Sequence, residues 1–475
     1  MIGLIISAAF AILCVYNFYW KRKSLPPGPT PFPLIGNFLD FYKHGKSETF
    51  EFFRKTYGDL YTLWLGDRPV VVFNKFEEIQ EAFIKNGDFY SGRPKNEAMA
   101  KVIRNGNYGI IMTEGDVWRE HRRFALHVLR NFGLGKNLMQ ERVLNEVTWF
   151  LEDLKKKQKS GEKEISVQNS IDIAVGSIIN GLIFGYAFHE VTISEDRKGI
   201  LRRLPYFKGK FQKAVELGDS MKAFFFGQIN DRKAKINFEE DSEPTDYVES
   251  YLRQQRKLEN SGDKNHMYSD AQLFGCVFDM WLAGQETTSN TLAWMVIYLM
   301  TNPEAQKRLH SELDKVIGSD RVITLDDKMN LPFVNAIVAE TQRLCNLVPT
   351  NVPHRVTQDQ NFHGFTIKED TIAIPQISAV LYDSKFFPEP HKFKPERFID
   401  AAGKFQTKPE LIPFSLGKRA CLGEGLARLE LYLFAANLFN HFEISSIPSN
   451  PPDLTRILGG TVSPEPFLAH LKQRY

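Results

Sequence analysis

The sequence has few cysteines, almost no net charge and no glycosylation signal. Its 475 residues include four cysteines, too few to build a disulfide framework in a chain of this length. No Asn-x-Ser/Thr acceptor occurs, which is typical of a domain that faces a reducing compartment. The 60 Lys and Arg residues against 57 Asp and Glu residues leave a charge of +3, too balanced for a nucleic-acid binder.

Low-complexity segments and internal repeats are also missing from residue 38 onward. A hydrophobic share of 43% and a charged share of 25% are ordinary for a globular chain. Leu60–Leu65 and Pro69–Phe73 have the pattern of short strands, whereas most of the remainder has the pattern of helices. The polar stretch Asn237–His266 predicts a helix between surface loops. We therefore expect one large, mainly α domain over residues 38–475 with a small β region.

The N-terminus has the pattern of a membrane anchor. Ile2 to Trp20 carry no charge, and as a helix they would span about 28 Å, enough to cross a bilayer core. Lys21, Arg22 and Lys23 follow at once, which places the rest of the chain on the cytosolic side. A cleaved signal peptide has its positive charges before the apolar stretch, so we expect a retained anchor over residues 1–20.

A proline-rich segment follows the anchor. Residues 21–37 combine the basic cluster with Pro26, Pro27, Pro29, Pro31 and Pro33. Proline fixes φ and cannot continue a helix, so this segment predicts a stiff arm between the anchor and the domain.

One helix of more than thirty residues is predicted inside the domain. Ser269 with Gln272 forms a capping-box pattern at its start, and Pro303 follows its end. The helix is apolar nearly all round, but Asp279, Gln285 and Glu286 argue against exposure to lipid. It should be the central buried helix.

The middle of this helix carries the sequence Ala283-Gly284-Gln285-Glu286-Thr287-Thr288. A buried acid beside a hydroxyl is unfavourable without partners, which marks the segment as a candidate site. The small residues Ala283 and Gly284 would let a bulky group approach the backbone. A helix kink with satisfied polar groups is the alternative interpretation.

A single cysteine lies in a glycine-rich loop near the C-terminus, in Phe414-Ser415-Leu416-Gly417-Lys418-Arg419-Ala420-Cys421-Leu422-Gly423. Arg419 and the start of the following helix, over Gly425–Phe439, both favour the thiolate. A zinc site would require further Cys or His ligands at close spacing, and none are there. A cysteine hydrolase would require a placed His base, and a buried inert cysteine is the remaining alternative.

Five ordered motifs resemble those of the cytochrome P450 family, in its animal microsomal branch. Phe414 to Gly423 resembles its haem-binding signature, and Ala283 to Thr288 its oxygen-activation motif. Glu340-Thr341-Gln342-Arg343 is similar to its Glu-x-x-Arg helix, and Pro395-Glu396-Arg397-Phe398 to its later arginine segment. Trp118-Arg119-Glu120-His121-Arg122 resembles its haem-propionate helix. The resemblance covers essentially the whole chain and implies the P450 fold, preceded by one transmembrane helix.

The resemblance implies that haem b (iron protoporphyrin IX) is bound with Cys421 as the axial thiolate ligand. Phe414 and Gly423 would pack beneath the ring, and Ala283 would let it lie close to the long helix. The residues implied to hold the propionates are Trp118, Arg122, His354 and Arg419.

Two further groups of residues receive roles from the resemblance. Glu286 and Thr287 would deliver protons during oxygen activation. Glu340 and Arg343 are one helical turn apart, spaced to pair, and Arg397 would join them as a structural fastening.

The implied activity is a haem-thiolate monooxygenase that inserts one atom of O2 into a hydrophobic small molecule. The sequence has no strand-borne Gly-x-Gly-x-x-Gly fingerprint for flavin or nicotinamide, so the electrons must come from a partner. The resemblance implies NADPH–cytochrome P450 reductase, with cytochrome b5 as a second donor, at the endoplasmic reticulum membrane. A haem isomerase or dehydratase and a non-catalytic haem carrier are alternatives, although neither would account for Glu286 beside Thr287.

The resemblance also assigns the segments that line the substrate pocket: Ser91–Asp116, Phe207–Phe226, Phe278–Thr287, Leu347–Val352 and Leu458–Val462. They are mostly apolar and aromatic, which leaves a xenobiotic, a fatty acid or a sterol open as substrate. A local basic patch for the electron donor is expected at Arg119, Arg123, Arg130, Lys418 and Arg428.

Overall fold

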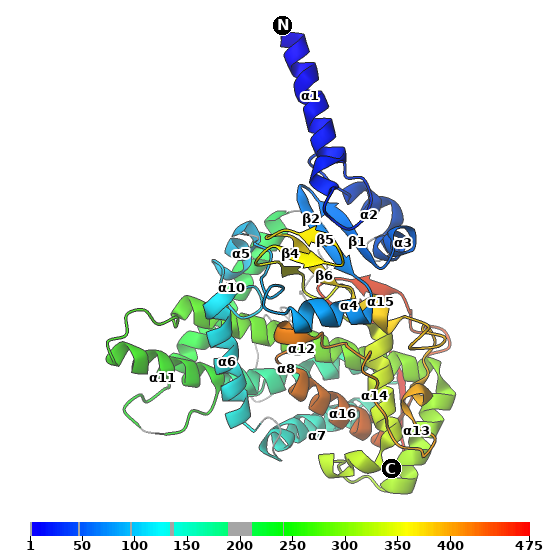
Figure 1. The fold of residues 1–475 in the computed structure, drawn as a ribbon. Helices are drawn as coiled ribbons and strands as arrows, with labels where there is room; N and C mark the ends of the chain where they lie inside the picture. Colours follow the sequence, from blue (N-terminus) through cyan, green and yellow to red (C-terminus); the bar gives the residue numbers. More distant parts are fainter. Residues whose placement is uncertain (1, 46–47, 96, 134–136, 189–210, 241) are drawn as a thin grey trace. The chain divides into compact units, whose positions relative to one another are not determined.

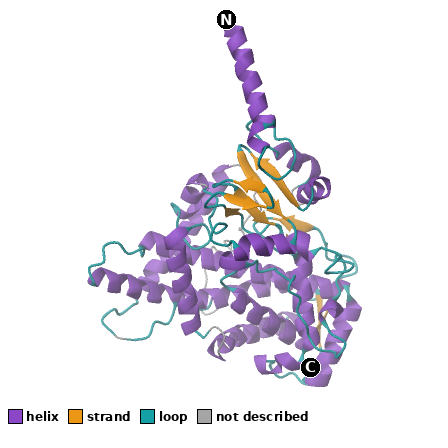
Figure 2. Ribbon diagram, viewed as in Figure 1, coloured by secondary structure: helices purple, strands orange, loops and turns teal. Residues whose placement is uncertain are grey.

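The computed structural model describes residues 2–45, 48–95, 97–133, 137–188, 211–240 and 242–475 (Figure 1). The chain forms two compact units. Unit 1 comprises Met1–Lys95, Val348–His391 and Pro409–Cys421, and unit 2 comprises Asn96–Leu347, Lys392–Lys408 and Leu422–Tyr475. Helices predominate and strands are few, which confirms the predicted fold class (Figure 2).

Unit 1 contains most of the β structure. Its sheet has the strand order β1-β2-β6-β3, in which β2 pairs antiparallel with β1 and parallel with β6. Phe53, Tyr61, Leu63, Val70 and Val72 form a buried core against one face of it. The elements of unit 1 are α1 (Ile2–Phe18), η1 (Trp20–Arg22), α2 (Phe38–His44), α3 (Glu48–Tyr57), β1 (Leu60–Leu65), β2 (Arg68–Phe73), α4 (Phe76–Gln80), the π-helix η2 (Glu81–Lys85), β3 (His354–Arg355), β4 (Gln360–Phe362), β5 (Phe365–Ile367), β6 (Ile372–Pro375), α15 (Ile377–Leu381) and η6 (Gly417–Arg419).

The N-terminal helix α1 ends at Phe18, two residues earlier than the expected apolar span. It has 17 residues, and apolar side chains such as Ile5, Ile12 and Leu13 are exposed on it. Among the described residues, the helix with the length and composition of a membrane span is α8 (Val167–Phe184), and 72% of it is buried inside the protein. Burial of that kind is typical of a core helix, so a membrane crossing by α1 stays a prediction.

The proline-rich arm packs against the strands of unit 1. Thr62 N donates to Pro27 O at 2.9 Å, and Gly36 forms an isolated bridge to Leu65. A side chain at Gly28 would collide with Thr62 O, 1.8 Å from the position of a Cβ. The arm is therefore held along β1 by backbone contacts.

Unit 2 is almost entirely helical, with two small hairpins, β7 with β10 and β8 with β9. Its elements are α5 (Glu97–Arg104), α6 (Gly115–Asn131), α7 (Asn137–Lys159), α8 (Val167–Phe184), α10 (Phe211–Lys233), α11 (Tyr247–Asn260), α12 (Asp270–Thr301), α13 (Pro303–Val316), η4 (Leu325–Asn330), α14 (Pro332–Cys345), η5 (Pro395–Phe398), α16 (Glu424–His441), β7 (Phe442–Ser445), β8 (Arg456–Leu458), β9 (Val462–Pro464) and β10 (His470–Gln473).

The long helix α12 lies at the centre of unit 2, and most of its residues are buried, as predicted (Figure 1). Ser269 caps it by accepting a hydrogen bond from Gln272 N. The expected capping box is only half formed, because the Gln272 side chain bonds instead to the backbone N and O of Gly109. The polar side chain thus holds a neighbouring loop against α12 rather than closing its own helix end.

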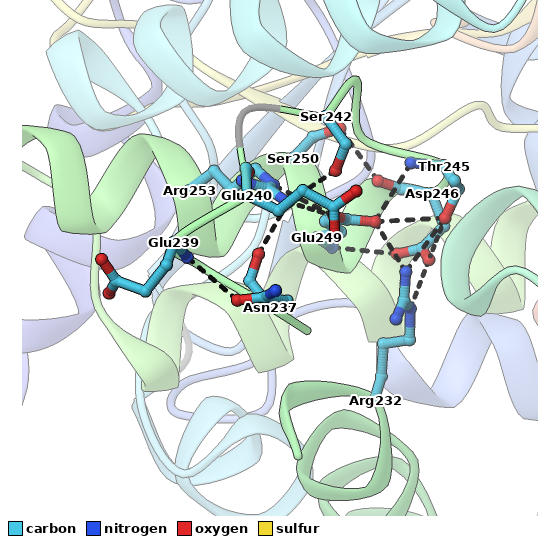
Figure 3. A network of polar contacts seen from close by, with 10 residues as sticks. All are labelled: Arg232, Asn237, Glu239, Glu240, Ser242, Thr245, Asp246, Glu249, Ser250 and Arg253. Carbon is cyan, nitrogen blue, oxygen red and sulfur yellow. Dashed lines mark hydrogen bonds and ion pairs between the residues drawn. The ribbon is translucent and has the colours of Figure 1, made fainter. Parts of the chain in front are cut away.

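A polar network joins the end of α10 to the start of α11 (Figure 3). Arg232 donates to Asp246 at 2.5 Å and to Glu249 at 2.6 Å, and Arg253 donates to Glu249 at 3.0 Å. Asp246 also caps α11 through Glu249 N at 2.9 Å. The helix predicted within Asn237–His266 is therefore fastened by charge-assisted hydrogen bonds, which are among the stronger kind.

Candidate functional site

The cysteine loop of unit 1 is a tight turn that leaves the thiol accessible. Cys421 N donates to Phe414 O at 2.9 Å, which closes the loop, and Cys421 is exposed. Gly417 has a φ of +75°, and a Cβ there would lie 1.9 Å from Phe83 O. This close approach to the backbone of Phe83 requires glycine.

Three buried or partly buried cationic and imidazole side chains lie near this loop in unit 1. Arg419 donates to Ser91 O at 2.8 Å, and Arg93 donates to Val352 O and Pro353 O. His354 is buried and its Nδ1 lies 2.6 Å from Tyr90 O.

The protonation of His354 follows from these neighbours. Burial, together with the positive charges of Arg93 and Arg419, holds the pKa of His354 well below its ordinary value. A carbonyl can only accept, so the neutral ring carries its proton on Nδ1. The His354 ring could donate from Nε2 only after this second nitrogen also takes up a proton. The negative charge of a carboxylate beside Nε2 would favour that protonation. Arg93 was not singled out by the sequence.

Helix α6 carries the other two residues expected at the propionates. Trp118 is buried and Arg122 is partly buried on it. Two exposed arginines of the same helix are compensated, because Arg119 pairs with Asp116 at 2.8 Å and Arg123 pairs with Glu120. Arg428 likewise pairs with Glu424, and Lys418 with Asp88. The expected basic patch is therefore weaker than the sequence indicated.

The motif of α12 presents Ala283 and Thr287 on one exposed stripe of unit 2. Thr287 Oγ1 donates to Ala283 O at 2.7 Å, and Ala283 itself is exposed. Gly284, which we expected to leave space for a ligand, instead contacts α8, because a Cβ there would lie 2.4 Å from Ile179 Cδ1. Gly284 thus lets α8 pack closely, and the space expected for a ligand beside Ala283 stays a prediction.

Glu286 lies among neutral hydrogen-bond donors. It accepts from Asn290 Nδ2 at 3.2 Å and from Thr461 Oγ1 at 3.4 Å. Burial raises the pKa of Glu286, although both hydrogen bonds act in the opposite direction. A carboxyl group of this kind can hold and release a proton closer to neutral pH than an exposed one.

A second acid lies behind the same motif on α16, the helix that follows Gly423. Burial raises the pKa of Glu430 to about 8, and its hydrogen-bond partner is Thr288. Helix α16 is buried along most of its length, and the polar side chains of Glu430, Asn437 and Asn440 are buried with it.

The structure brings Glu340, Arg343 and Arg397 together in unit 2. Arg343 Nε and Nη2 lie 2.7 Å and 2.8 Å from the two Glu340 oxygens, and Arg397 Nε lies 3.1 Å from the same carboxylate. Lys394 N adds a fourth donor at 2.8 Å. All the side chains are almost fully buried, and the cations compensate the buried carboxylate.

A buried ion pair that the sequence did not indicate fastens the segment before α6 to α12. Asp279 Oδ1 accepts from Arg104 Nη2 at 2.6 Å, while Oδ2 accepts from Ile110 N and Ile111 N at 2.8 Å each. Asp279 shares a helix face with Ala283 and Thr287, as expected from the spacing of four. The pairing with Arg104 could not be foreseen, because 175 residues separate the two.

These donor sets fit a haem. Cys421 is a free, exposed cysteine and offers one soft sulfur ligand. Haem iron is held by one such thiolate in this class of site. Buried guanidinium groups such as those of Arg93 and Arg419 suit the two carboxylates of haem.

Comparisons with known proteins show the family of this chain. The family model for cytochrome P450 matches residues 26–470. The chain is 34% identical to cytochrome P450 2C7 of Rattus norvegicus, with 97% of this chain and 96% of that protein covered. It is 33% identical to cytochrome P450 2B4 of Oryctolagus cuniculus, with 91% and 90% covered, and 32% identical to cytochrome P450 2E1 of Sus scrofa, with 93% and 91% covered. With a match over nearly its whole length, this chain belongs to the cytochrome P450 family of haem-thiolate monooxygenases.

Proposed function

We propose that this monooxygenase is anchored in the endoplasmic reticulum membrane by α1 and oxidises a hydrophobic small molecule with electrons from NADPH. The electrons would reach it through NADPH–cytochrome P450 reductase, with cytochrome b5 as a second donor. The observation that carries the proposal is the exposed Cys421 thiol in a loop that only glycine at position 417 permits. The family and the microsomal type of the relatives support the choice of partner and membrane.

The chain's own residues have distinct tasks in this proposal. Cys421 ligates the haem iron, and Trp118, Arg122, His354 and Arg419, joined by Arg93, hold the propionates. Haem, when bound, supplies the transfer of electrons to O2 and the insertion of one oxygen atom into the substrate.

Protons are the task of α12. Burial raises the pKa of Glu286, so this carboxyl group takes up a proton at a higher pH than an exposed one does. The Thr287 hydroxyl donates to Ala283 O. By turning away from that carbonyl, it can donate the same hydrogen to a reacting oxygen instead. Proton delivery decides whether O2 is cleaved to give product and water or released as peroxide.

Two observations favour a neutral, hydrophobic substrate. Phe225 of α10 packs edge-on against Phe278 and Trp281 of α12, at ring-centroid distances of 5.8 Å and 5.4 Å. These aromatic rings belong to the segments assigned to the pocket, although Phe207–Phe226 begins outside the described residues. Arg104, in the segment Ser91–Asp116, already forms an ion pair with Asp279 and is therefore a poor partner for an anionic substrate.

The anchoring of α1 is supported by its exposed apolar side chains and by the cluster Lys21, Arg22 and Lys23 that follows. Positive charges at the end of an apolar helix stay on the cytosolic side. The catalytic units would then face the cytosol, where the reductase is available.

The test is the carbon monoxide difference spectrum of the reduced protein. Cys421→Ala should abolish the red-shifted band and all turnover, because a neutral side chain cannot donate electron density to the iron. Cys345→Ala is the matched control, because burial raises the pKa of Cys345 to about 12 and keeps it a thiol. Retention of the band in Cys421→Ala would refute the assignment.

A further inference from the structure

A third carboxyl group, that of Asp172, lies beside the motif of α12 that carries Glu286. Asp172 belongs to α8, the helix that packs most extensively against α12. Gln285 Nε2 donates to Asp172 O at 3.0 Å and to Ser289 Oγ at 3.1 Å. The Ser289 hydroxyl in turn is hydrogen-bonded to the Asp172 carboxyl group. Gln285 and Ser289 therefore connect α8 to the turn of α12 that carries Glu286.

The surroundings of Asp172 favour its protonated form. Burial, and to a lesser degree the charge of Glu286, raises the pKa of Asp172 to about 7, against the hydrogen bond from Ser289. The nearest ion pair on α7, Asp153 with Lys157, bonds to Ser170 rather than to Asp172. On α16, Glu430 bonds to Thr288.

The cluster formed by Asp172, Gln285 and Ser289 also contains a hydrogen-bond acceptor that bonds to none of the described residues, and Asp172 is partly exposed. Gln285 is 96% buried, and its Oε1 has no hydrogen-bond partner among the described residues. A buried amide oxygen of this kind is a usual partner of an internal water, which needs two to four polar neighbours. Asp172 itself is only partly buried, so it can exchange protons with solvent.

We propose that Asp172 is a proton-relay residue that supplies a new proton to Glu286 from the side of α12 that contacts α8. This inference rests on the role of Glu286 in the proposed function. Asp172 does not touch the reacting atoms and acts through Glu286.

The transfer balances without any further reactant than water. The O–H bond of the Asp172 carboxylic acid breaks, and its proton passes to Ser289 Oγ as the Ser289 proton moves on. One bridging water carries that proton across the single helical turn between Ser289 and the Glu286 carboxylate. Asp172 is left as a carboxylate and regains a proton from solvent.

The first experiment measures the protonation of Asp172 directly in the resting protein. Infrared spectra recorded against pH should contain the carbonyl stretching band of a protonated carboxylic acid that disappears as the pH rises through about 7. The band should be absent from Asp172→Asn and shifted in Ser289→Ala, which removes its hydrogen bond. A spectrum of Asp172→Asn identical to that of the wild type would overturn the proposal.

The second experiment measures coupling, the ratio of product formed to NADPH consumed. Asp172→Asn has the shape of the protonated acid and should fold, but its peroxide yield should rise about threefold to tenfold. Wild-type coupling should fall as the pH rises through about 7, since the donor is then deprotonated, and Asp172→Asn should lack this inflection. Asp153→Asn, an acid beside the same helix without a link to α12, is the control and should keep wild-type coupling.

The outcomes separate this inference from the proposed function. If Glu286→Gln uncouples turnover while Asp172→Asn keeps both the coupling and the pH inflection, the relay is refuted and the role of Glu286 stands. If neither variant changes coupling, the role of Glu286 itself fails. A loss of haem binding in Asp172→Asn with unchanged coupling would make Asp172 a structural residue and refute the relay as well.

Discussion

Two groups of acidic side chains in unit 2 have opposite kinds of partner, charged in one group and neutral in the other. Glu340 is surrounded by two guanidinium groups and a backbone N–H, all within 3.1 Å. Glu286 and Asp172 have only neutral partners among the described residues, namely Asn290, Thr461 and Ser289. Two arginines compensate the charge of Glu340, whereas burial raises the pKa of Glu286 and of Asp172.

The difference separates an acid held by charged groups from acids held by neutral ones. A carboxylate held by two arginines belongs to a buried ion network, and we expect it to serve as a fastening. An acid whose pKa is raised by burial takes up a proton at a higher pH than an exposed one does. In the proposed function, Glu340 fastens the fold, whereas Glu286 and Asp172 transfer protons.

The largest expected effect comes from breaking the charged group. Arg343→Ala leaves Glu340 buried with one cation fewer, which should destabilise the protein by about 3–5 kcal/mol. That is a large part of the stability of an ordinary domain, so little haem-loaded protein should be recovered. Haem content per protein and the thermal unfolding midpoint are the measurements.

A neighbouring surface pair provides the control for this variant. Glu396→Gln breaks the exposed pair between Arg308 and Glu396, whose atoms lie 3.0 Å apart. Such pairs contribute about 0–1 kcal/mol, so haem content should stay normal. Normal haem content in Arg343→Ala would show that the Glu340 group is not a fastening.

A smaller effect on the fold, but a clear effect on turnover, is expected at Glu286, whose hydrogen-bond partners are neutral. Glu286→Gln keeps the shape and the hydrogen-bonding capacity of the side chain but cannot transfer a proton. Haem binding should be retained, while peroxide should replace much of the product, and Thr287→Ala should act in the same direction. The ratio of product and peroxide to NADPH consumed tests this, and unchanged ratios in both variants would contradict it.

The smallest effect is expected on the exposed arginines of α6. Asp116 and Glu120 already offset Arg119 and Arg123, so reversing both arginines to glutamate should slow reductase-supported turnover by about twofold to threefold, chiefly at low salt. Peroxide-driven turnover bypasses the partner and should not change. Equal losses in both assays would place the damage at the haem site instead of the docking surface.

Local patterns in the sequence predicted the elements that carry this comparison. The apolar run from Phe274 to Met300, with its Ser269 cap, predicted α12 almost to its ends, and the strands β1 and β2 follow their β-rich segments. The spacing of Glu340 and Arg343 predicted a pair within one helical turn. Signals of this kind lie within a few residues of one another.

Long-range partners could not be predicted from such patterns. Gln272 looked like half of a capping box but bonds to Gly109, and Asp279 pairs with Arg104 across 175 residues. Asp172 had a signal, an acid inside an otherwise apolar helix, but nothing in the sequence indicated that Ser289 would face it. The sequence suggested that Gly284 leaves space for a ligand, whereas in the structure it lets Ile179 of α8 approach closely.

The sequence by itself determined the order of helices and strands, the single cysteine in its glycine loop and the family to which the chain belongs. These depend on periodicity, capping and spacing, all of which act over one or two turns of chain. Only the tertiary structure decided which acids are paired with arginines and which have neutral partners that leave the pKa raised. The pKa of a carboxyl group depends on the solvent excluded from it and on the charges that neighbouring helices place around it, and distant parts of the chain supply both.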